Sequence, residues 1–253
     1  MSDKERVALI TGANGGIGLA AVKYFAEKNW RVAAVSRSEL KFDLPDGCEF
    51  YQVDIGDPAQ VKVLFGQVSE KYGRLDTLVN NAAIQIAKPL LDTSIEEWDR
   101  LMDVNLRAVF VSVKEAYKLI KKVQGSIVNI ASVHAVATSA DIASYAASKG
   151  AMLALTRAMA IEFAPDNVRV NTVLPGAVDT PMLDAGLARG HVSDGSLEDK
   201  KAELASRTVI GRVGTPEEIA NAIYFLANNS LSSFITGQSI IVDGGATIRL
   251  STE

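Results

Sequence analysis

The stretch that decides the fold runs from Val7 to Gly18 and reads VALITGANGGIG. It opens with four apolar residues, Val7 to Ile10, with no polar residue between them. A run of this kind predicts a short strand that is buried on both faces. Four glycines follow within the eight residues from Thr11 to Gly18, and a segment of helical period continues from Ile17 to Lys28. The stretch therefore predicts a buried strand, a tight turn and a helix.

The same order of strand and helix repeats along the rest of the chain. Segments of helical period alternate with apolar, strand-like runs, which read in order RVAAVS, FYQVD, LDTLVNNAA, SIVNIAS, VRVNTVLPG and SIIVDGG. The two longest segments predict helices from Ile95 to Lys122 and from Ser144 to Ala164. About seven buried strands with intervening helices predict an α/β fold, a doubly wound, Rossmann-like parallel sheet with helices on both faces. We expect a single domain over residues 1–253.

Two helix starts carry their own signature. The tetrapeptides Ser94 to Glu97 (SIEE) and Thr215 to Glu218 (TPEE) both read as capping boxes, the second with proline at the first helical position. The least regular stretch is 179–212, which is rich in Gly, Ala, Asp and Ser. We interpret it as a lid over a site at the carboxyl ends of the strands.

Composition and charge narrow the classes of partner. The 253 residues carry a net charge of −4, so electrostatics favours neither nucleic acid nor an anionic membrane, and small molecules are expected. Cys48 is the only cysteine, which excludes an intrachain disulfide and a cysteine-rich metal site, and no metal ligand set is predicted. The N-terminal MSDKER is charged where a signal peptide is apolar, and no run reaches the ~18 apolar residues of a membrane span. We expect a cytoplasmic protein.

The glycines at positions 12, 16 and 18 follow the pattern G-x-x-x-G-x-G, which differs from the G-x-G-x-x-G dinucleotide fingerprint. Glycine nevertheless lets the backbone approach phosphate groups, and the following helix supplies N–H groups and the positive end of its dipole. The loop is therefore consistent with a pyrophosphate site. A strand-to-helix turn with no ligand is the alternative.

A second pattern, SYAASK, places Tyr145 and Lys149 four residues apart. On a helix this spacing puts both side chains on one face, so the ammonium can sit near the phenol. A nearby cation stabilises a phenolate and lowers the pKa of a tyrosine, which makes proton transfer feasible near neutral pH. The alternative is a solvated helix face with no chemistry.

Six motifs occur in the order and approximate spacing found in the short-chain dehydrogenase/reductase family, which the whole chain resembles. They are TGANGGIG at 11–18, NNAA at 80–83, Asn105 in DVNL, Ser132 in NIAS, YAASK at 145–149 and PGAVDT at 175–180. The resemblance implies hydride transfer between a nicotinamide cofactor and a carbonyl or secondary alcohol. One departure is Ala83, which stands where the family usually has glycine and would be strained only if the turn needed positive φ.

The resemblance also implies a role for each motif residue. Tyr145 would be the acid/base, Ser132 would orient the carbonyl oxygen, and Lys149 would lower the tyrosine pKa and hold the nicotinamide ribose. Asn105 would position a water that links Lys149 to solvent. Donors from Ser132 and Tyr145 would stabilise the negative charge that develops on the carbonyl oxygen during reduction.

The residues expected to contact the cofactor come from four of these motifs, TGANGGIG, NNAA, YAASK and PGAVDT, and from the ends of the second and third strands. They are Gly12, Asn14, Gly16, Ile17, Gly18, Ser36, Arg37, Asp54, Ile55, Asn81, Ala82, Tyr145, Lys149, Pro175, Gly176, Val178 and Thr180. His134 and Met182 are candidates for substrate contact. The alternatives are a polar loop histidine without a catalytic role at His134 and a simple strand-terminal turn acid at Asp54.

The end of the second strand, AAVSRS, indicates the cofactor. A site that prefers NAD places an acid there to bind the ribose hydroxyls, but this sequence has Ser36 and Arg37. No carboxylate would repel a 2′-phosphate, and the Arg37 guanidinium could bind it through forked hydrogen bonds. We therefore predict NADP, with NAD as the alternative. Gly15 argues for a moderate preference, because many NADP-dependent relatives carry Lys or Arg at this place.

Other readings of the sequence stay open. A catalytically silent dinucleotide-binding regulator is the alternative outside catalysis, since fold alone does not establish function. A nucleotide-sugar epimerase or dehydratase is disfavoured by length and by the spacing of the glycine loop. The substrate class is undecided between sugar, polyol, ketone and 3-oxoacyl compounds. Relatives commonly form homotetramers through two long helices, here 105–122 and 144–164, and the last strand, so a homotetramer is expected.

Overall fold

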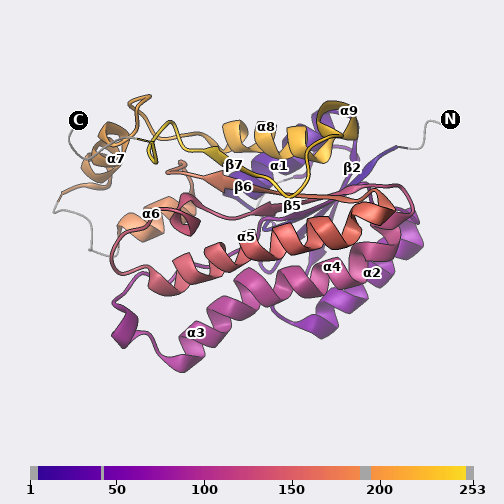
Figure 1. Ribbon diagram of the computed structural model, residues 1–253, viewed down its shortest axis with the longest axis horizontal. Helices are drawn as coiled ribbons and strands as arrows, with labels where there is room; N and C mark the ends of the chain where they lie inside the picture. The colour runs from indigo at the N-terminus through magenta and orange to yellow at the C-terminus, as the bar shows by residue number, and fades with distance from the viewer. Residues whose placement is uncertain (1–4, 41–42, 189–194, 249–253) are drawn as a thin grey trace.

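The computed structural model describes residues 5–40, 43–188 and 195–248, and Figure 1 shows their arrangement. Seven strands form one parallel sheet in the order β3-β2-β1-β4-β5-β6-β7. The strands are β1 (Val7–Thr11), β2 (Arg31–Ser36), β3 (Cys48–Gln52), β4 (Thr77–Asn80), β5 (Ser126–Ile130), β6 (Arg169–Pro175) and β7 (Ser239–Val242). The chain builds outward from β1 to β3 and then returns to add β4 on the other side of β1. The doubly wound fold predicted from the sequence is confirmed, and its order reverses at β1.

Helices cover both faces of the sheet, with α1 and α8 on one face and α2, α4 and α5 on the other (Figure 1). The α-helices are α1 (Gly16–Glu27), α2 (Pro58–Tyr72), α3 (Ile95–Met102), α4 (Ala108–Lys121), α5 (Ala143–Phe163), α6 (Pro181–Leu187), α7 (Leu197–Ser206), α8 (Pro216–Ala227) and α9 (Asn229–Ser232). Shorter helical turns are η1 (Leu90–Asp92), the π-helical η2 (Asp103–Arg107), η3 (Val133–Ala135) and η4 (Ala164–Asp166). Across the described ranges, no helix combines the length and the apolar composition needed to cross a membrane.

Alternate residues of β1 enter two separate cores. Val7 and Leu9 pack with apolar side chains of α2, α4 and α5, whereas Ala8 and Ile10 pack with those of α1 and α8. All four side chains are buried. Because helices cover both faces, every position of the strand must be apolar, which is why the sequence shows no polar alternation there.

Both predicted capping boxes form. At the start of α3 the Ser94 hydroxyl accepts the N–H of Glu97, and the Glu97 carboxylate accepts the N–H of Ser94. Thr215 and Glu218 make the same reciprocal pair at the start of α8, with Pro216 at the first helical position. Each pair satisfies two backbone donors that the helix itself leaves without partners.

The segment predicted to be helical from Ile95 to Lys122 is helical from Ile95 to Lys121, but a π-helical turn interrupts its regular α-helix. The π-helical turn η2 separates α3 from α4 and contains Asn105, whose side chain is fully buried. Asn105 bonds to both backbone groups of Ile84, at 2.9 Å each. These bonds offset the poorer helical geometry of a π turn, which apolar periodicity alone does not reveal.

The prediction of an irregular stretch over 179–212 is wrong for two of its segments. Helix α6 begins after Thr180, whose hydroxyl accepts the N–H of Leu183, and α7 begins with a capping box between Ser196 and Asp199. Composition rich in Gly, Ala, Asp and Ser concealed two short helices that their caps define. Residues 189–194 of this stretch lie outside the described residues.

Candidate active site

A cavity of about 1330 Å³ opens at the carboxyl ends of the strands. The turns after β1, β2, β4, β5 and β6 line it, together with the start of α5 and parts of α6 and α7. All the residues predicted to bind cofactor or substrate or to act in catalysis line this cavity, except Gly18 and Asn105. No group of three or more His, Cys, Asp and Glu side chains that could hold a metal ion occurs within the described part of the chain.

The glycine loop is closely packed at Gly12 and Gly18 and open at Gly15. A Cβ at Gly12, where φ is +70°, would lie 2.7 Å from Asn81 Nδ2, and one at Gly18 would lie 2.0 Å from the Gly12 oxygen. Gly18, predicted to contact the cofactor, therefore packs beneath the loop. At Gly15 a Cβ would meet nothing within 4 Å, and no described side chain caps the N-terminus of α1. The N–H groups of that terminus and the absence of a Cβ fit a pyrophosphate.

Hydrogen bonds tie the glycine loop to the end of β4. The Thr11 hydroxyl accepts the N–H groups of Asn81 at 3.0 Å and Ala82 at 3.1 Å, and it lies 3.3 Å from the Val79 carbonyl oxygen. Asn81 Nδ2 donates back to the Thr11 carbonyl at 2.9 Å. Ala83 does not adopt positive φ, so alanine in place of the usual glycine is not strained.

Ser36, Arg37 and Asp54 form the end of the cavity beside β2 and β3. Ser36 is buried and Arg37 is exposed. Asp54 accepts the N–H of Gly56 at 2.9 Å and forms an ion pair with Arg100 of α3 at 2.7 Å. Burial raises the pKa of Asp54, but the Gly56 N–H and the Arg100 guanidinium outweigh it and hold that pKa below its ordinary value. Sequence reasoning missed Arg100, because nothing in its local pattern marks it.

Tyr145 and Lys149 lie together on the buried side of α5. Tyr145 is 7% exposed and Lys149 is 2% exposed, so the alternative of a solvated helix face is wrong. Lys149 Nζ donates to the Ile130 carbonyl oxygen at 2.7 Å and lies 5.5 Å from the centroid of the Tyr145 ring. Ser132, two residues after the end of β5, lies within reach of the Tyr145 side chain, whose pKa it lowers through a side-chain hydrogen bond. The structure thus brings Ser132, Tyr145 and Lys149 into one cluster.

Burial governs the ionisation of this cluster. It raises the pKa of Tyr145 to about 12, with the hydrogen bond to Ser132 acting in the other direction. It lowers the pKa of Lys149 to about 7. Both shifts favour neutral side chains, because desolvation disfavours a charge of either sign. Lys149 was expected to lower the pKa of Tyr145, but burial raises that pKa instead.

Asn105 does not line the cavity but is linked to the backbone of the cluster through Ser148. Its Nδ2 donates to the Ser148 hydroxyl at 3.1 Å, and that hydroxyl donates to the Tyr145 carbonyl at 2.7 Å. Together with its two bonds to Ile84, Asn105 therefore joins the turn after β4 to the first turns of α5. The water-positioning role implied by the resemblance stays a prediction.

The two candidates for substrate contact both border the cavity. His134 Nδ1 lies 3.1 Å from the Thr138 hydroxyl, and its ring stands edge-on to Tyr145 with centroids 6.0 Å apart. Burial lowers the pKa of His134. Met182, on α6, is 39% exposed. Sequence reasoning missed polar lining residues that only the folded chain brings here: Gln85, Glu203, Arg207, Thr208 and Thr247.

Comparison with known proteins agrees with this geometry. A family model described as enoyl-(acyl carrier protein) reductase matches residues 12–247. The 3-oxoacyl-[acyl-carrier-protein] reductase FabG of Thermotoga maritima is 39% identical, over 96% of this chain and 98% of its own. Meso-2,3-butanediol dehydrogenase of Serratia marcescens is 36% identical, over 96% of this chain and 94% of its own.

Solved structures match over nearly the whole chain. Ligand-free aldohexose dehydrogenase of Thermoplasma acidophilum superimposes with a TM-score of 0.92 at 34% identity, covering 98% of this chain and 96% of its own. ElxO with NADP bound gives 0.86 at 30% identity, over 97% of this chain and 100% of its own. The 3-ketoacyl-(acyl-carrier-protein) reductase of Brucella melitensis complexed with NADH gives 0.85 at 30%, with the same coverage. The chain therefore belongs to the short-chain dehydrogenase/reductase family of NAD(P)-dependent oxidoreductases.

Proposed function

We propose that this chain transfers a hydride between NADP(H) and a small carbonyl compound or secondary alcohol. The observation that carries the proposal is the buried cluster of Ser132, Tyr145 and Lys149, which shares one cavity with an open glycine loop at the start of α1. A proton donor, a hydrogen-bond donor and a phosphate site within one cavity are the parts that carbonyl reduction needs.

The cofactor, when bound, supplies or accepts the hydride. In reduction the Tyr145 hydroxyl donates its proton to the substrate oxygen, while the Ser132 hydroxyl donates a hydrogen bond to the same oxygen. A phenol with a pKa near 12 keeps its proton at neutral pH and is suited to the acid role. Lys149, held by the Ile130 carbonyl, contributes its charge once it is protonated and binds the nicotinamide ribose.

Preference for NADP over NAD rests on Ser36 and Arg37. Arg37 is exposed at the border of the cavity, and no ion pair to it occurs among the described residues. Its guanidinium can bind a 2′-phosphate, and one charged contact of ~1.5–3 kcal/mol corresponds to roughly 10- to 100-fold in affinity. The Brucella melitensis relative was solved in complex with NADH, so the same hydride transfer with NAD is the alternative.

Steady-state kinetics test the cofactor proposal. We expect kcat/KM to favour NADPH over NADH in the native protein, and Arg37→Asp to reverse the order, because a carboxylate repels the 2′-phosphate and accepts ribose hydroxyls. Arg31→Asp, which alters a half-buried arginine of β2 outside the cavity, is the control and should leave the order unchanged. Equal use of both cofactors, or preference for NADH in the native protein, would contradict the proposal.

The substrate class stays open among sugars, polyols, ketones and 3-oxoacyl compounds. A panel drawn from these classes, followed by the near-ultraviolet absorbance of the reduced nicotinamide, separates an enzyme from a regulator that only binds the dinucleotide. Turnover with any member supports the enzyme. Tight dinucleotide binding without turnover across the panel supports the silent regulator.

We also propose a single domain over residues 1–253, with the stretch 179–212 as a lid, and a homotetramer. Helices α6 and α7 supply Met182, Leu183 and Leu204 to the cavity lining, which supports a covering role. On the outer faces of α4 and α5, Phe110 is 56% exposed and Ile161 is 76% exposed in the single chain. Exposed apolar side chains on two neighbouring helices support contact with another copy.

A further inference from the structure

The two ends of the stretch 179–212 are hydrogen-bonded to each other. Gly214 N–H donates to the Ala177 carbonyl at 2.9 Å, and the Asp179 N–H donates to the Gly214 carbonyl at 2.9 Å, which makes a parallel bridge between Val178 and Gly214. We call Ala177–Asp179 and Gly214 the stem. Because the chain enters and leaves the stretch through the stem, its position sets where the stretch starts and ends.

The stem is also part of the cavity wall. Ala177 and Val178 line the cavity, as do Gly176 before them and Thr180 after them. This wall follows β6, whose neighbour β5 leads into Ser132, so it stands on the side of the cavity where the catalytic cluster lies. A shift of Gly214 would therefore move a wall beside the catalytic cluster.

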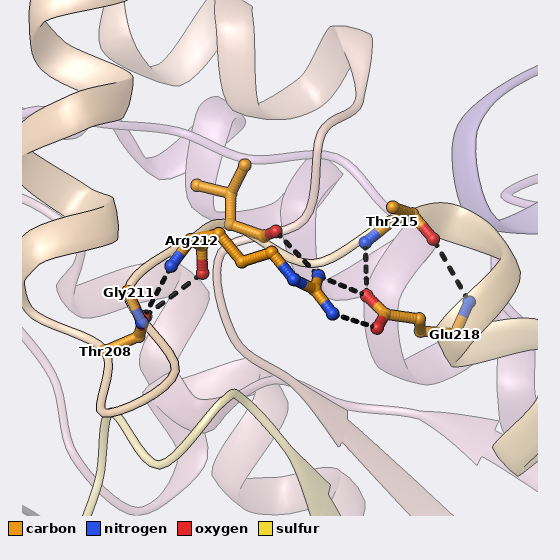
Figure 2. Close-up of polar contacts among 6 residues, drawn as sticks. Thr208, Gly211, Arg212, Thr215 and Glu218 are labelled. Carbon is orange, nitrogen blue, oxygen red and sulfur yellow. Dashed lines mark hydrogen bonds and ion pairs between the residues drawn. The ribbon is translucent and has the colours of Figure 1, made fainter.

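An ion pair between Arg212 and Glu218, which flank Gly214 in the sequence, holds the chain in place, as Figure 2 shows. The Arg212 guanidinium forks onto the Glu218 carboxylate, with Nη1 to Oε2 at 2.9 Å and Nη2 to Oε1 at 2.5 Å. Nη1 also donates to the Val213 carbonyl at 3.2 Å, and Glu218 Oε2 accepts the Thr215 N–H at 2.8 Å. The carboxylate thus holds the chain on both sides of Gly214. The Arg212 bonds and the Thr215 N–H lower the pKa of Glu218 to about 2, so it stays ionised near neutral pH.

The approach from α7 is fixed as well. The Thr208 hydroxyl accepts the N–H groups of Gly211 at 3.0 Å and of Arg212 at 3.2 Å (Figure 2). It also lies 2.9 Å from the Ala205 carbonyl oxygen. Thr208 is 6% exposed and borders the cavity. Residues 208–218 therefore form one hydrogen-bonded unit between the cavity and α8.

We propose that Arg212 and Glu218 are positioning residues: their forked ion pair fixes Gly214, and through the stem it fixes the cavity wall at Ala177 and Val178. Neither residue lines the cavity, so they act through the backbone of Gly214. The inference rests on the proposed function, because that wall would bound the nicotinamide half of the dinucleotide.

The test compares Arg212→Met with a matched control, Arg74→Met. Arg74 also forks onto a carboxylate, with Nε and Nη2 at 2.9 and 2.6 Å from the oxygens of Asp76, and that carboxylate also accepts a backbone N–H, from Val7. This second fork lies at the amino ends of β1 and β4, away from the cavity. Both variants lose a forked ion pair, but only Arg212→Met releases the stem.

Hydrogen–deuterium exchange reads the stem directly. In Arg212→Met we expect the peptides that contain the Asp179 and Gly214 amides to exchange roughly tenfold faster than in the native protein, since one charge-assisted fork no longer opposes local opening. Arg212→Lys keeps the charge without the fork and should fall between the two. Arg74→Met should leave both peptides at native rates while it lowers the melting temperature.

Binding gives the second readout. The ligands are whichever of NADPH and NADH the native protein prefers, and the ADP-ribose with the same 2′ substituent, which lacks nicotinamide. Arg212→Met should weaken the dinucleotide about fivefold to tenfold and ADP-ribose less than about twofold, because the released wall bounds only the nicotinamide half. Arg74→Met should change neither affinity.

Native exchange at Asp179 and Gly214 in Arg212→Met would overturn the inference, whatever the enzyme does. Equal weakening of the dinucleotide and of ADP-ribose would also overturn it, because it indicates general loosening. Should Arg212→Met fail to fold, Glu218→Gln weakens the fork and keeps an oxygen for the Thr215 N–H. A native protein that neither binds a nicotinamide dinucleotide nor reduces any carbonyl contradicts the proposed function instead, and the exchange result still decides the role of the fork.

Discussion

Tyr145 and Lys149 show how the burial of single residues sets the chemistry of this site. Both side chains are buried on α5, and both are shifted toward their neutral forms. The phenol can therefore act as an acid without help. It can act as a base only when positive charge near it outweighs desolvation, and a protonated Lys149 is the cation that the chain provides.

Removing the phenol hydroxyl should stop the chemistry and spare the fold. We expect Tyr145→Phe to lose at least ~10²-fold in kcat, the low end of general acid/base contributions, while it keeps dinucleotide affinity. Tyr117→Phe removes a hydroxyl that bonds to Asp166, outside the cavity, and should keep native turnover. Near-native turnover in Tyr145→Phe, measured by nicotinamide absorbance, would contradict the assigned role.

The two reaction directions should respond differently to pH. Reduction needs the protonated phenol, which is the stable form at every pH below about 12, so its rate should stay flat from about pH 6 to pH 9. Oxidation needs the phenolate beside a protonated Lys149. The phenolate fraction rises about tenfold per pH unit below the pKa of Tyr145, and the protonated fraction of Lys149 falls at the same rate above its pKa of about 7, so the oxidation rate should rise up to about pH 7 and then level off. Rate–pH profiles in both directions measure this, and an oxidation rate that falls as pH rises would contradict it.

At the scale of elements, a buried polar network fixes α5 on the sheet. Asn80 of β4 donates to Asn129 of β5 at 2.9 Å, and Asn129 donates to Thr156 of α5 at 2.8 Å. Thr172 of β6 donates to the Thr156 hydroxyl at 2.8 Å. All four side chains are buried, so each hydroxyl or amide without its partner would carry a desolvation cost. The network holds the helix that carries Tyr145.

Breaking this network should cost stability. Asn129→Ala leaves the Asn80 amide without its partner and leaves the Thr156 hydroxyl bonded only to Thr172, and we expect the free energy of unfolding to fall by about 2–4 kcal/mol. Urea denaturation measures the change. Asn221→Ala, at an exposed position of α8, is the control and should change stability by less than about 0.5 kcal/mol. A similar loss in both variants would show that the network contributes nothing special.

At the scale of the whole molecule, the direction of the sheet places the chemistry. All seven strands of the sheet run parallel, so the turns after β1, β2, β4, β5 and β6 open at one edge and line one cavity. The helices, by contrast, leave apolar side chains on the outside of the single chain, Phe110 on α4 and Ile161 on α5 among them. The first feature predicts where ligands bind, and the second predicts where another copy binds.

The oligomeric state can be tested by measuring the molar mass of the protein in solution. Light scattering should give a mass near four times 27.0 kDa at micromolar concentration, and Phe110→Asp should shift it to a smaller species because it places a charge in the expected contact. Val63→Asp, at a 62% exposed position of α2, is the matched control and should keep the native mass. A native protein that stays monomeric would contradict the homotetramer.

Much of the fold was determined by the sequence alone, because its signals are local. The strand Val7–Thr11, the capping boxes at Ser94 and Thr215, and the doubly wound α/β class are confirmed by the structure. The strand and the capping boxes depend on residues at most a few positions apart, and the α/β class follows from the order in which such local elements alternate along the chain. Most of the candidate site also followed from its motifs, while the roles of its residues, the cytoplasmic location and the lid stay predictions.

Only the tertiary structure decided the features that depend on contacts between distant residues. The π-helical turn at Asn105 exists because its amide bonds to Ile84 on another segment, and Arg100 borders the cavity because α3 packs beside Asp54. The fork of Arg212 onto Glu218 holds the stem through backbone bonds between 177–179 and 214. Likewise, the pKa values near 12 and 7 at Tyr145 and Lys149 reflect desolvation, which a sequence cannot show because water leaves these side chains only when the helix packs onto the sheet.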